Sequence, residues 1–171
     1  MNAKHELDEV AAASGLVLEV TAAPEALAAE PEVQSFVALA IEMADEVAGP
    51  AQGGIAVLVD GDERIRALNR LWRGIDKPTN VLSFSYPDAP AGVPQHVGDI
   101  AISYQTAAAE AAAEGKSFAH HMQHLAVHGF LHVLGYDHES DEDAEAMERL
   151  ERTILARLGV PDPYIARDAE G

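Results

Sequence analysis

Three histidines within one eleven-residue stretch, HGFLHVLGYDH (residues 128–138), constrain the fold more than any other feature of this sequence. His128 and His132 are four residues apart in a strongly helical segment, so their side chains leave the same face about 6 Å apart along the axis. Gly135 can adopt a positive φ without steric cost, which allows the chain to leave the helix and turn back. The stretch therefore predicts a long helix and a tight return that brings His138 beside the other two histidines.

Three imidazoles at this spacing are typical ligands of a catalytic zinc ion. Such a site has three protein ligands and leaves a fourth position for water, which the metal acidifies towards neutral pH. The chain contains no cysteine, so neither thiolate ligands nor disulfides are available. We expect one zinc ion per chain, held by His128, His132 and His138 together with water. The alternative is a chance gathering of histidines at a helix end; the pair, the glycine and the third histidine together favour the metal site.

Other histidines near this stretch are expected to stay outside the set of ligands. His124 lies four residues before His128, but a fourth ligand would close the site, so we expect it to support a ligand or to be half-buried in the core. Asp137 is expected either to orient a ligand or to cap the turn. His96 lies in a loop rich in Pro and Gly (87–96) and is expected to be solvated.

Hydrophobic patterning predicts strands interleaved with helices around this motif. Strands are expected over 16–20, 54–60, 79–86 and 97–103, and helices over 33–48, 64–72, 106–115, about 118–134 and from the acidic run at 139–145 to Gly159. Asp60 with Glu63 is typical of a capping box at the start of the second helix. The expected class is α/β-like or α+β, and we favour an α+β fold with one small mixed sheet packed by about five helices and a metal site at the end of a long helix.

Length and composition favour one globular domain. The 171 residues are 48% hydrophobic, which is enough for one core and too little chain for two comfortable domains. We expect residues 1–14 to be a loose N-terminal extension and residues 15–165 to form a single metallohydrolase domain. The start of the chain has no apolar region typical of a secretion signal and no stretch reaches 18 apolar residues, so we expect a soluble, cytoplasmic protein.

The positive charges are concentrated in one segment, residues 64–77, which has two interpretations. The net charge of −18 argues against non-specific adhesion to nucleic acid. Five of the eleven Lys and Arg residues nevertheless fall within one window, at Arg64, Arg66, Arg70, Arg73 and Lys77. The window is either a solvated helix face balanced by nearby acidic residues (Asp60, Asp62 and Glu63) or, if it faces the histidines, a substrate-binding surface.

Gly129 argues against a protease. In the metzincin pattern H-E-x-x-H-x-x-G-x-x-H a Glu beside the first histidine is the general base of peptide hydrolysis, whereas here the position after His128 is Gly129. A hydrolase without this base needs metal-activated water or a substrate with its own nucleophile. RNA is such a substrate, because its 2′-hydroxyl lies next to the scissile phosphate.

Taken with LNRLWRGIDKPTNVLSF (68–84) and VGDIAIS (97–103), the histidine stretch resembles the YbeY family of metal-dependent endoribonucleases. The resemblance runs from about residue 55 to DPYIA near the C-terminus. It implies a zincin-like α+β fold, zinc at His128, His132 and His138, and a functional arginine at Arg73. It also implies a cytoplasmic, single-strand-specific enzyme of small-subunit (16S) rRNA 3′ end maturation and ribosome quality control, whose partners are an rRNA precursor and the small ribosomal subunit or its proteins.

Residue chemistry makes a role for Arg73 plausible independently, since a planar guanidinium binds phosphate oxygens bidentately where a lysine does not. We predict Arg73 to bind phosphate and stabilise the transition state, with Arg70 and Lys77 as weaker substrate contacts. For Arg70 a helix-surface ion pair is an equal alternative. Arg149 and Arg152 are assigned to exposed ion pairs on the last helix, amid acidic residues (Glu145, Glu148 and Glu151).

Two other functions stay open at this point. One is a metallohydrolase of a peptide or small amide, which Gly129 discourages. The other is a non-catalytic ribosome-assembly factor in which zinc mainly shapes the fold. The acidic surface would suit a basic ribosomal protein as partner.

Overall fold

A computed structural model describes residues 15–86 and 95–165 of the chain and contains one sheet with helices on both faces. The strands are β1 (Leu16–Ala22), β2 (Gly53–Asp60), β3 (Val81–Ser85) and β4 (His96–Ser103). The helices are α2 (Pro24–Ala29), α3 (Val33–Ala48), α4 (Asp62–Arg73), α5 (Tyr104–Glu114), α6 (Phe118–Val133) and α7 (Asp141–Arg157). The expected N-terminal extension (1–14) lies outside the described residues.

The sheet is mixed, as the sequence predicts. Its order is β1-β2-β4-β3, with β1, β2 and β4 parallel and β3 antiparallel to β4 at one edge. Ser83 of β3 pairs with Ile100 of β4, and Ser85 pairs with Gly98. The expected α+β class with a small mixed sheet is therefore confirmed.

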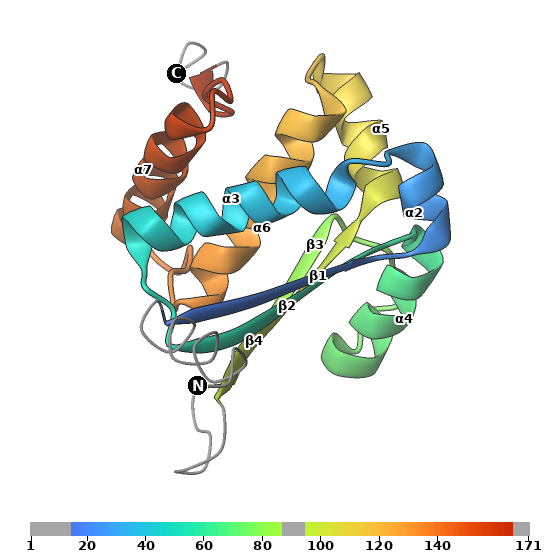
Figure 1. Cartoon of the computed structure of the whole chain (residues 1–171), viewed down its shortest axis with the longest axis horizontal. Helices are drawn as coiled ribbons and strands as arrows, with labels where there is room; N and C mark the ends of the chain where they lie inside the picture. The colour runs from blue at the N-terminus through green and yellow to red at the C-terminus, as the bar shows by residue number, and fades with distance from the viewer. Residues whose placement is uncertain (1–14, 87–94, 166–171) are drawn as a thin grey trace, which may run out of the picture.

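Most of the core lies on one face of this sheet. Helices α3 and α6 cover that face, α7 packs on both of them, and α4 lies on the opposite face (Figure 1). Val57, Ile100 and Phe130 are among the fully buried side chains between the sheet and α6. A smaller apolar cluster of Ile65, Leu82 and Ala101 joins α4 to the other face. The long histidine-bearing helix α6 thus packs on β3 and β4 of the sheet.

Two local expectations are wrong. Helix α2 was not expected, because it has six residues of which only Ala26 is buried, too few to show a helical period. The capping box at the start of α4 does not form: the helix begins at Asp62, and the Asp60 carboxylate instead accepts a hydrogen bond from the Gly61 N–H (2.7 Å). Asp62 accepts hydrogen bonds from the Ser103 and Thr106 hydroxyls, so tertiary contacts replace the local cap.

Within the described ranges, no helix combines the length and the apolar character needed to cross a membrane.

Candidate metal centre

The end of α6 has the geometry that positions His138. Gly135 follows the helix with φ +107°, and its N–H donates to the His132 carbonyl (3.0 Å), while the Tyr136 N–H donates to the Leu131 carbonyl (3.0 Å). This pair of bonds is a Schellman motif, in which a left-handed glycine satisfies the last carbonyls of the helix and reverses the chain. The predicted tight return after the histidine pair is therefore confirmed, and it depends on glycine.

The three predicted ligands meet in space. One donor nitrogen from each of His128, His132 and His138 lies within 4.8 Å of the others. The Nε2 atoms of His128 and His132 are 3.0 Å apart, and the His138 ring centroid is 5.2 Å from each of the other two. Ligand atoms of a tetrahedral zinc site lie about 3.4 Å apart, given Zn–N bonds of about 2.1 Å. The donor set and its spacing therefore fit a single metal ion.

Burial favours the neutral form of His132, one of the three candidate ligands. The pKa of His132 lies below its ordinary value, first because burial disfavours its charged form and then because His128 and His138 repel a second positive charge. A backbone hydrogen bond to Tyr136 acts in the opposite direction. A neutral imidazole offers a lone pair to a cation, so the local environment favours ligation.

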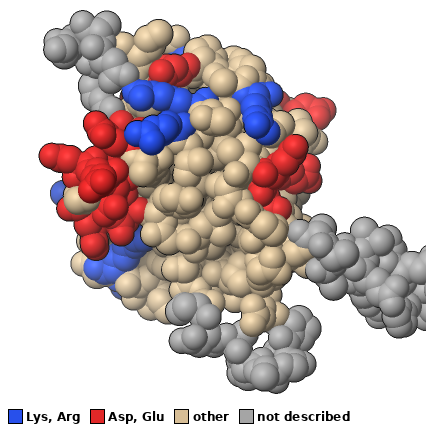
Figure 2. All heavy atoms as spheres, turned by 90° about the vertical axis from the view of Figure 1, so that its left-hand side faces the viewer, with Lys and Arg blue, Asp and Glu red and all other residues tan. Residues whose placement is uncertain are grey.

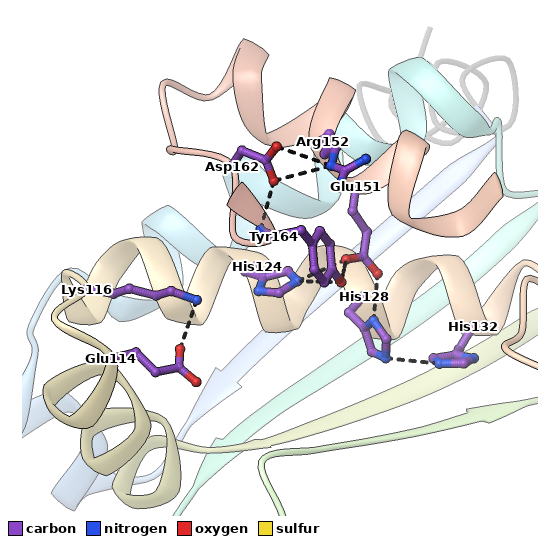
Figure 3. A network of polar contacts seen from close by, with 9 residues as sticks. All are labelled: Glu114, Lys116, His124, His128, His132, Glu151, Arg152, Asp162 and Tyr164. Carbon is purple, nitrogen blue, oxygen red and sulfur yellow. Dashed lines mark hydrogen bonds and ion pairs between the residues drawn. The ribbon is translucent and has the colours of Figure 1, made fainter. Parts of the chain in front are cut away.

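An acidic residue that the sequence analysis misplaced lies directly behind the histidines. Glu151 of α7, assigned above to an exposed ion pair, has no exposed surface. Its Oε1 accepts a hydrogen bond from Nδ1 of His128 (2.7 Å), and its Oε2 accepts from Nε2 of His124 (2.9 Å) and from the Tyr164 hydroxyl (Figure 3). The ion-pair assignment of Glu151 is wrong.

The electrostatics of this carboxylate follow from those contacts. Burial alone would raise the pKa of Glu151, but the hydrogen bonds from His124 and His128 hold it well below its ordinary value. A signal for it was present in the sequence: Glu151 stands on the same helical stripe as Met147, Ile154 and Leu155, all buried. A carboxylate on the apolar face of a helix needs buried partners, and histidine is a suitable donor.

The remaining histidines take supporting or separate positions. His124 is mostly buried and binds Glu151, which agrees with its expected place outside the set of ligands. His121 is buried and lies 3.0 Å from Glu110. His96 is exposed as expected, but it begins β4 and its Nε2 lies 2.7 Å from Asp99. The stretch expected as a loop therefore ends before His96, and its residues 87–94 lie outside the described part of the chain.

The Asp137 side chain caps the turn that follows α6. Its Oδ1 accepts a hydrogen bond from the Glu139 N–H (3.1 Å), an Asx-type contact that stabilises the segment carrying His138. Of the two roles left open for Asp137, the structure shows turn capping.

The position that carries the base in metzincins faces the sheet. Gly129 is buried, and a Cβ built on it would lie 2.9 Å from Cγ2 of Ile100 and 3.2 Å from Cγ2 of Val81. Glycine at this position lets α6 approach β3 and β4 closely. A glutamate here would enter the core, so the missing acid has a packing cause.

The side chain of Arg73 lies against the edge strand β3, and none of its described contacts reaches the three histidines. It is the last residue of α4, whereas the sequence analysis ended this helix at residue 72. Its Nη2 donates to the Ser83 carbonyl (3.0 Å), and its guanidinium lies 5.5 Å from the centre of the Phe84 ring. The side chain is exposed and held against β3.

The C-terminal end of β3, next to the residues that contact Arg73, lies near the end of α6 that carries His132. Ser85 pairs with Gly98, and a Cβ built on Gly98 would collide with Val133, the neighbour of His132 in α6. The strand that contacts the guanidinium of Arg73 therefore ends beside the C-terminal turn of α6.

The other basic residues of this window differ in their contacts. Arg66 forms a two-bond pair with Asp76 (2.8 and 3.1 Å), which holds the pKa of that carboxyl below its ordinary value. Arg70 also lowers the pKa of Asp76 from a greater distance, by charge alone. Lys77 is exposed, and its carbonyl accepts a hydrogen bond from the Asn69 side chain (2.9 Å). Of the acidic residues near this window, Glu63 acts on Arg66 through its charge, whereas Asp60 and Asp62 make hydrogen bonds outside the window.

Arg152 of the last helix forms an ion pair, as expected, and this ion pair reaches beyond the helix. Arg152 pairs with Asp162 (3.2 Å), and its guanidinium lies 5.5 Å from the centre of the Tyr164 ring, so it contacts the segment after α7. Arg149 is exposed, as expected.

Together these features define a class of protein: an α+β protein with three clustered histidines that could bind a metal ion at the end of a helix. Comparison with known proteins identifies the family within this class. The family model described as endoribonuclease YbeY matches residues 21–159, and the chain belongs to this family.

Relatives named endoribonuclease YbeY support that membership. One from Rhodopseudomonas palustris (strain BisB18) is 56% identical over 146 residues, covering 82% of this chain and 87% of the relative. One from Chelativorans sp. (strain BNC1) is 57% identical over 118 residues, covering 68% and 72%. The solution structure of TM1509 from Thermotoga maritima is similar in fold, with a TM-score of 0.52 at 20% identity over 83% of this chain and 91% of that one.

Proposed function

We propose that this protein is a zinc-dependent, single-strand-specific endoribonuclease that acts in small-subunit (16S) rRNA 3′ end maturation and ribosome quality control. The observation that carries the proposal is the convergence of His128, His132 and His138 in a member of the endoribonuclease YbeY family. In this proposal residues 15–165 form one metallohydrolase domain.

The histidines supply the metal-binding part of this activity. His128, His132 and His138 would hold one zinc ion per chain, together with water. A zinc ion bound there would supply Lewis acidity and lower the pKa of water, which suits either water or the RNA 2′-hydroxyl as nucleophile. With Gly129 packed against the sheet, the described chain offers no general base at the metzincin position.

Arg73 supplies positive charge where phosphoryl transfer develops negative charge. Its guanidinium is exposed, and the Phe84 ring and the Ser83 carbonyl limit its freedom, so little ordering is needed when it binds a phosphate. Arg70 and Lys77, both exposed, extend the same surface as weaker substrate contacts. For Arg70 the attraction to Asp76 competes with this role.

The charge of the protein also indicates where RNA and the ribosomal subunit contact its surface. The net charge of −18 repels nucleic acid over much of the surface, so RNA must approach where positive side chains gather. Figure 2 shows Lys and Arg side chains in separate groups with Asp and Glu between them on one face. We propose that a cytoplasmic rRNA precursor binds near Arg73, and that acidic surface contacts the small ribosomal subunit or its basic proteins.

One experiment separates this function from its alternatives. The purified protein is incubated with structured and single-stranded RNA and with a denatured protein substrate, each with and without a chelator, and the His132→Ala variant is the matched control. Chelator-sensitive cleavage of single-stranded RNA, lost in the variant, is expected. Chelator-sensitive proteolysis would instead support a peptide hydrolase, and RNA binding without cleavage would support an assembly factor with structural zinc.

A further inference from the structure

We propose that Glu151 is the positioning residue of the metal centre: it acts through His128, and Tyr164 and His124 hold it in place. This inference rests on the proposed metal site at His128, His132 and His138. Glu151 does not touch the position of the ion. Its role is to fix which nitrogen of His128 faces that position.

The first argument is the direction of one hydrogen bond. Ionised Glu151 can only accept, so the 2.7 Å contact with Nδ1 of His128 requires a proton on that nitrogen. In a neutral imidazole the other nitrogen, Nε2, then carries the lone pair, and it is Nε2 of His128 that lies 3.0 Å from Nε2 of His132. A carboxylate behind a ligand histidine is a general device for fixing tautomer and ring orientation in metal sites.

The second argument is the cost of placing a carboxylate there. Glu151 is fully buried on α7, within an otherwise apolar stripe, and a buried charge without full partnering is strongly unfavourable. Three donors satisfy it: His128 on Oε1, and His124 with Tyr164 on Oε2. An apolar residue would fill this position at lower cost, so the carboxylate serves the histidines rather than the packing of α7.

The third argument concerns the segment after α7. The Asp162 carboxylate accepts a hydrogen bond from the Tyr164 N–H (2.8 Å) and pairs with Arg152 (3.2 Å), whose guanidinium also lies over the Tyr164 ring. These contacts orient the Tyr164 hydroxyl onto Glu151 (Figure 3). The chain past the last helix is thereby connected to the metal centre through one hydroxyl and one carboxylate.

Glu151→Gln tests the proposal with almost no change of shape. A glutamine has one carbonyl oxygen, so it cannot accept from His128 and from the other two donors at once. If its amide donates to Nδ1 of His128, the proton moves to Nε2 and blocks the metal. We expect zinc affinity, measured by competition with a fluorescent chelator, to fall about ten- to hundredfold. The visible absorption spectrum of the cobalt-substituted protein should also change.

The control and the second variant separate positioning from a general loss of structure. Glu145→Gln makes the same change at an exposed position of the same helix and should leave zinc affinity and the cobalt spectrum unchanged. Tyr164→Phe removes one donor from Glu151 and should lower zinc affinity by less than about tenfold. Far-UV circular dichroism and thermal unfolding of the metal-free proteins show whether each variant folds.

A measurement on the unmodified protein keeps the test decisive if Glu151→Gln does not fold. In the metal-free chain at about pH 8, above the ordinary histidine pKa, nitrogen NMR should find His128 protonated on Nδ1. Protonation on Nε2, or wild-type zinc affinity and an unchanged cobalt spectrum in folded Glu151→Gln, would overturn the proposal. Retention of zinc by His132→Ala would instead overturn the metal site itself, so the two failures are distinguishable.

Discussion

Gly129 of α6 lies so close to Ile100 of β4 that a Cβ on the glycine would come within 2.9 Å of the isoleucine Cγ2. This contact explains why the residue after His128 carries no acidic side chain. The residue after His128 points into the sheet, and the closeness of helix and sheet depends on its lacking a side chain.

Gly129→Ala should destabilise the protein although alanine is the better helix former. The gain in helix propensity is about 1 kcal/mol, whereas overpacking a core costs about 1–3 kcal/mol, so we expect a net loss of about 1 kcal/mol in urea unfolding. In an Ile100→Ala background the same substitution should cost less or stabilise. Identical effects of Gly129→Ala in both backgrounds would show that the close approach has no energetic consequence.

Gly129→Glu should not create a protease. A glutamate at this position enters the core without a partner, and an uncompensated buried charge costs about 3–5 kcal/mol. We therefore expect loss of folded protein in circular dichroism and no proteolysis of a denatured substrate. A folded Gly129→Glu variant that cleaves peptides in a chelator-sensitive manner would contradict both the packing and the functional proposal.

Zinc content should depend on the three clustered histidines and not on their neighbour. His128→Ala, His132→Ala and His138→Ala each remove one of three ligands and should abolish most of the roughly one zinc per chain expected by elemental analysis. His124→Ala, on the same helix, should keep most of its zinc and lower only the affinity, because His124 contacts Glu151 and is not one of the three candidate ligands. Stoichiometric zinc in the His132→Ala variant would disprove the site.

Arg73→Ala should keep fold and zinc but lose RNA cleavage. Loss of a charge-assisted contact made in the transition state lowers the rate roughly a hundredfold or more. Arg73→Lys should not restore full activity, since an ammonium cannot bind two phosphate oxygens in one plane. The measurement is cleavage rate per zinc-loaded chain at fixed salt.

Arg149→Ala is the control for that experiment, because Arg149 is exposed on α7. Arg152 is a poorer control than the sequence suggested, since it contacts Asp162 and Tyr164 beside Glu151. Equal losses at Arg73 and Arg149 would mean that net charge alone governs cleavage.

Lys77→Ala should weaken RNA binding without affecting the chemical step. A lysine that contacts phosphate contributes mainly through release of counterions, so the slope of log affinity against log salt should decrease by about one. Binding titrations at several salt concentrations measure this slope. An unchanged slope would place Lys77 outside the RNA-binding surface.

Tyr86 should titrate above its ordinary range. Its hydroxyl donates to Asp99 (2.7 Å), and this hydrogen bond, followed by burial and the charge of Asp99, raises the pKa of Tyr86. A raised pKa in the folded state means that the contact stabilises the fold below the ordinary tyrosine pKa and is lost as pH rises through the folded-state pKa. Ultraviolet titration, with Tyr86→Phe to identify the signal, should show that Asp99→Asn lowers this pKa.

Patterns confined to short stretches of the chain were sufficient for much of this fold. The α3 boundaries follow from apolar spacing ended by Gly49, and the return after α6 follows from one glycine of positive φ. Both depend on contacts between residues at most a few positions apart, which local sequence determines. The three histidines fall within one such stretch, so their convergence was predictable.

Glu151 and Gly129 show what the sequence alone did not determine. Glu151 was read as an exposed partner of arginines because its neighbours on α7 are charged, yet packing of α7 on α6 buries it against His124 and His128. Gly129 has no room for a side chain because it packs against Ile100 and Val81, which lie on two strands far from it in sequence. The histidine spacing by itself determined that a metal centre could form. Only the tertiary structure decided which residues support it, because burial and partnering of a side chain depend on elements distant along the chain.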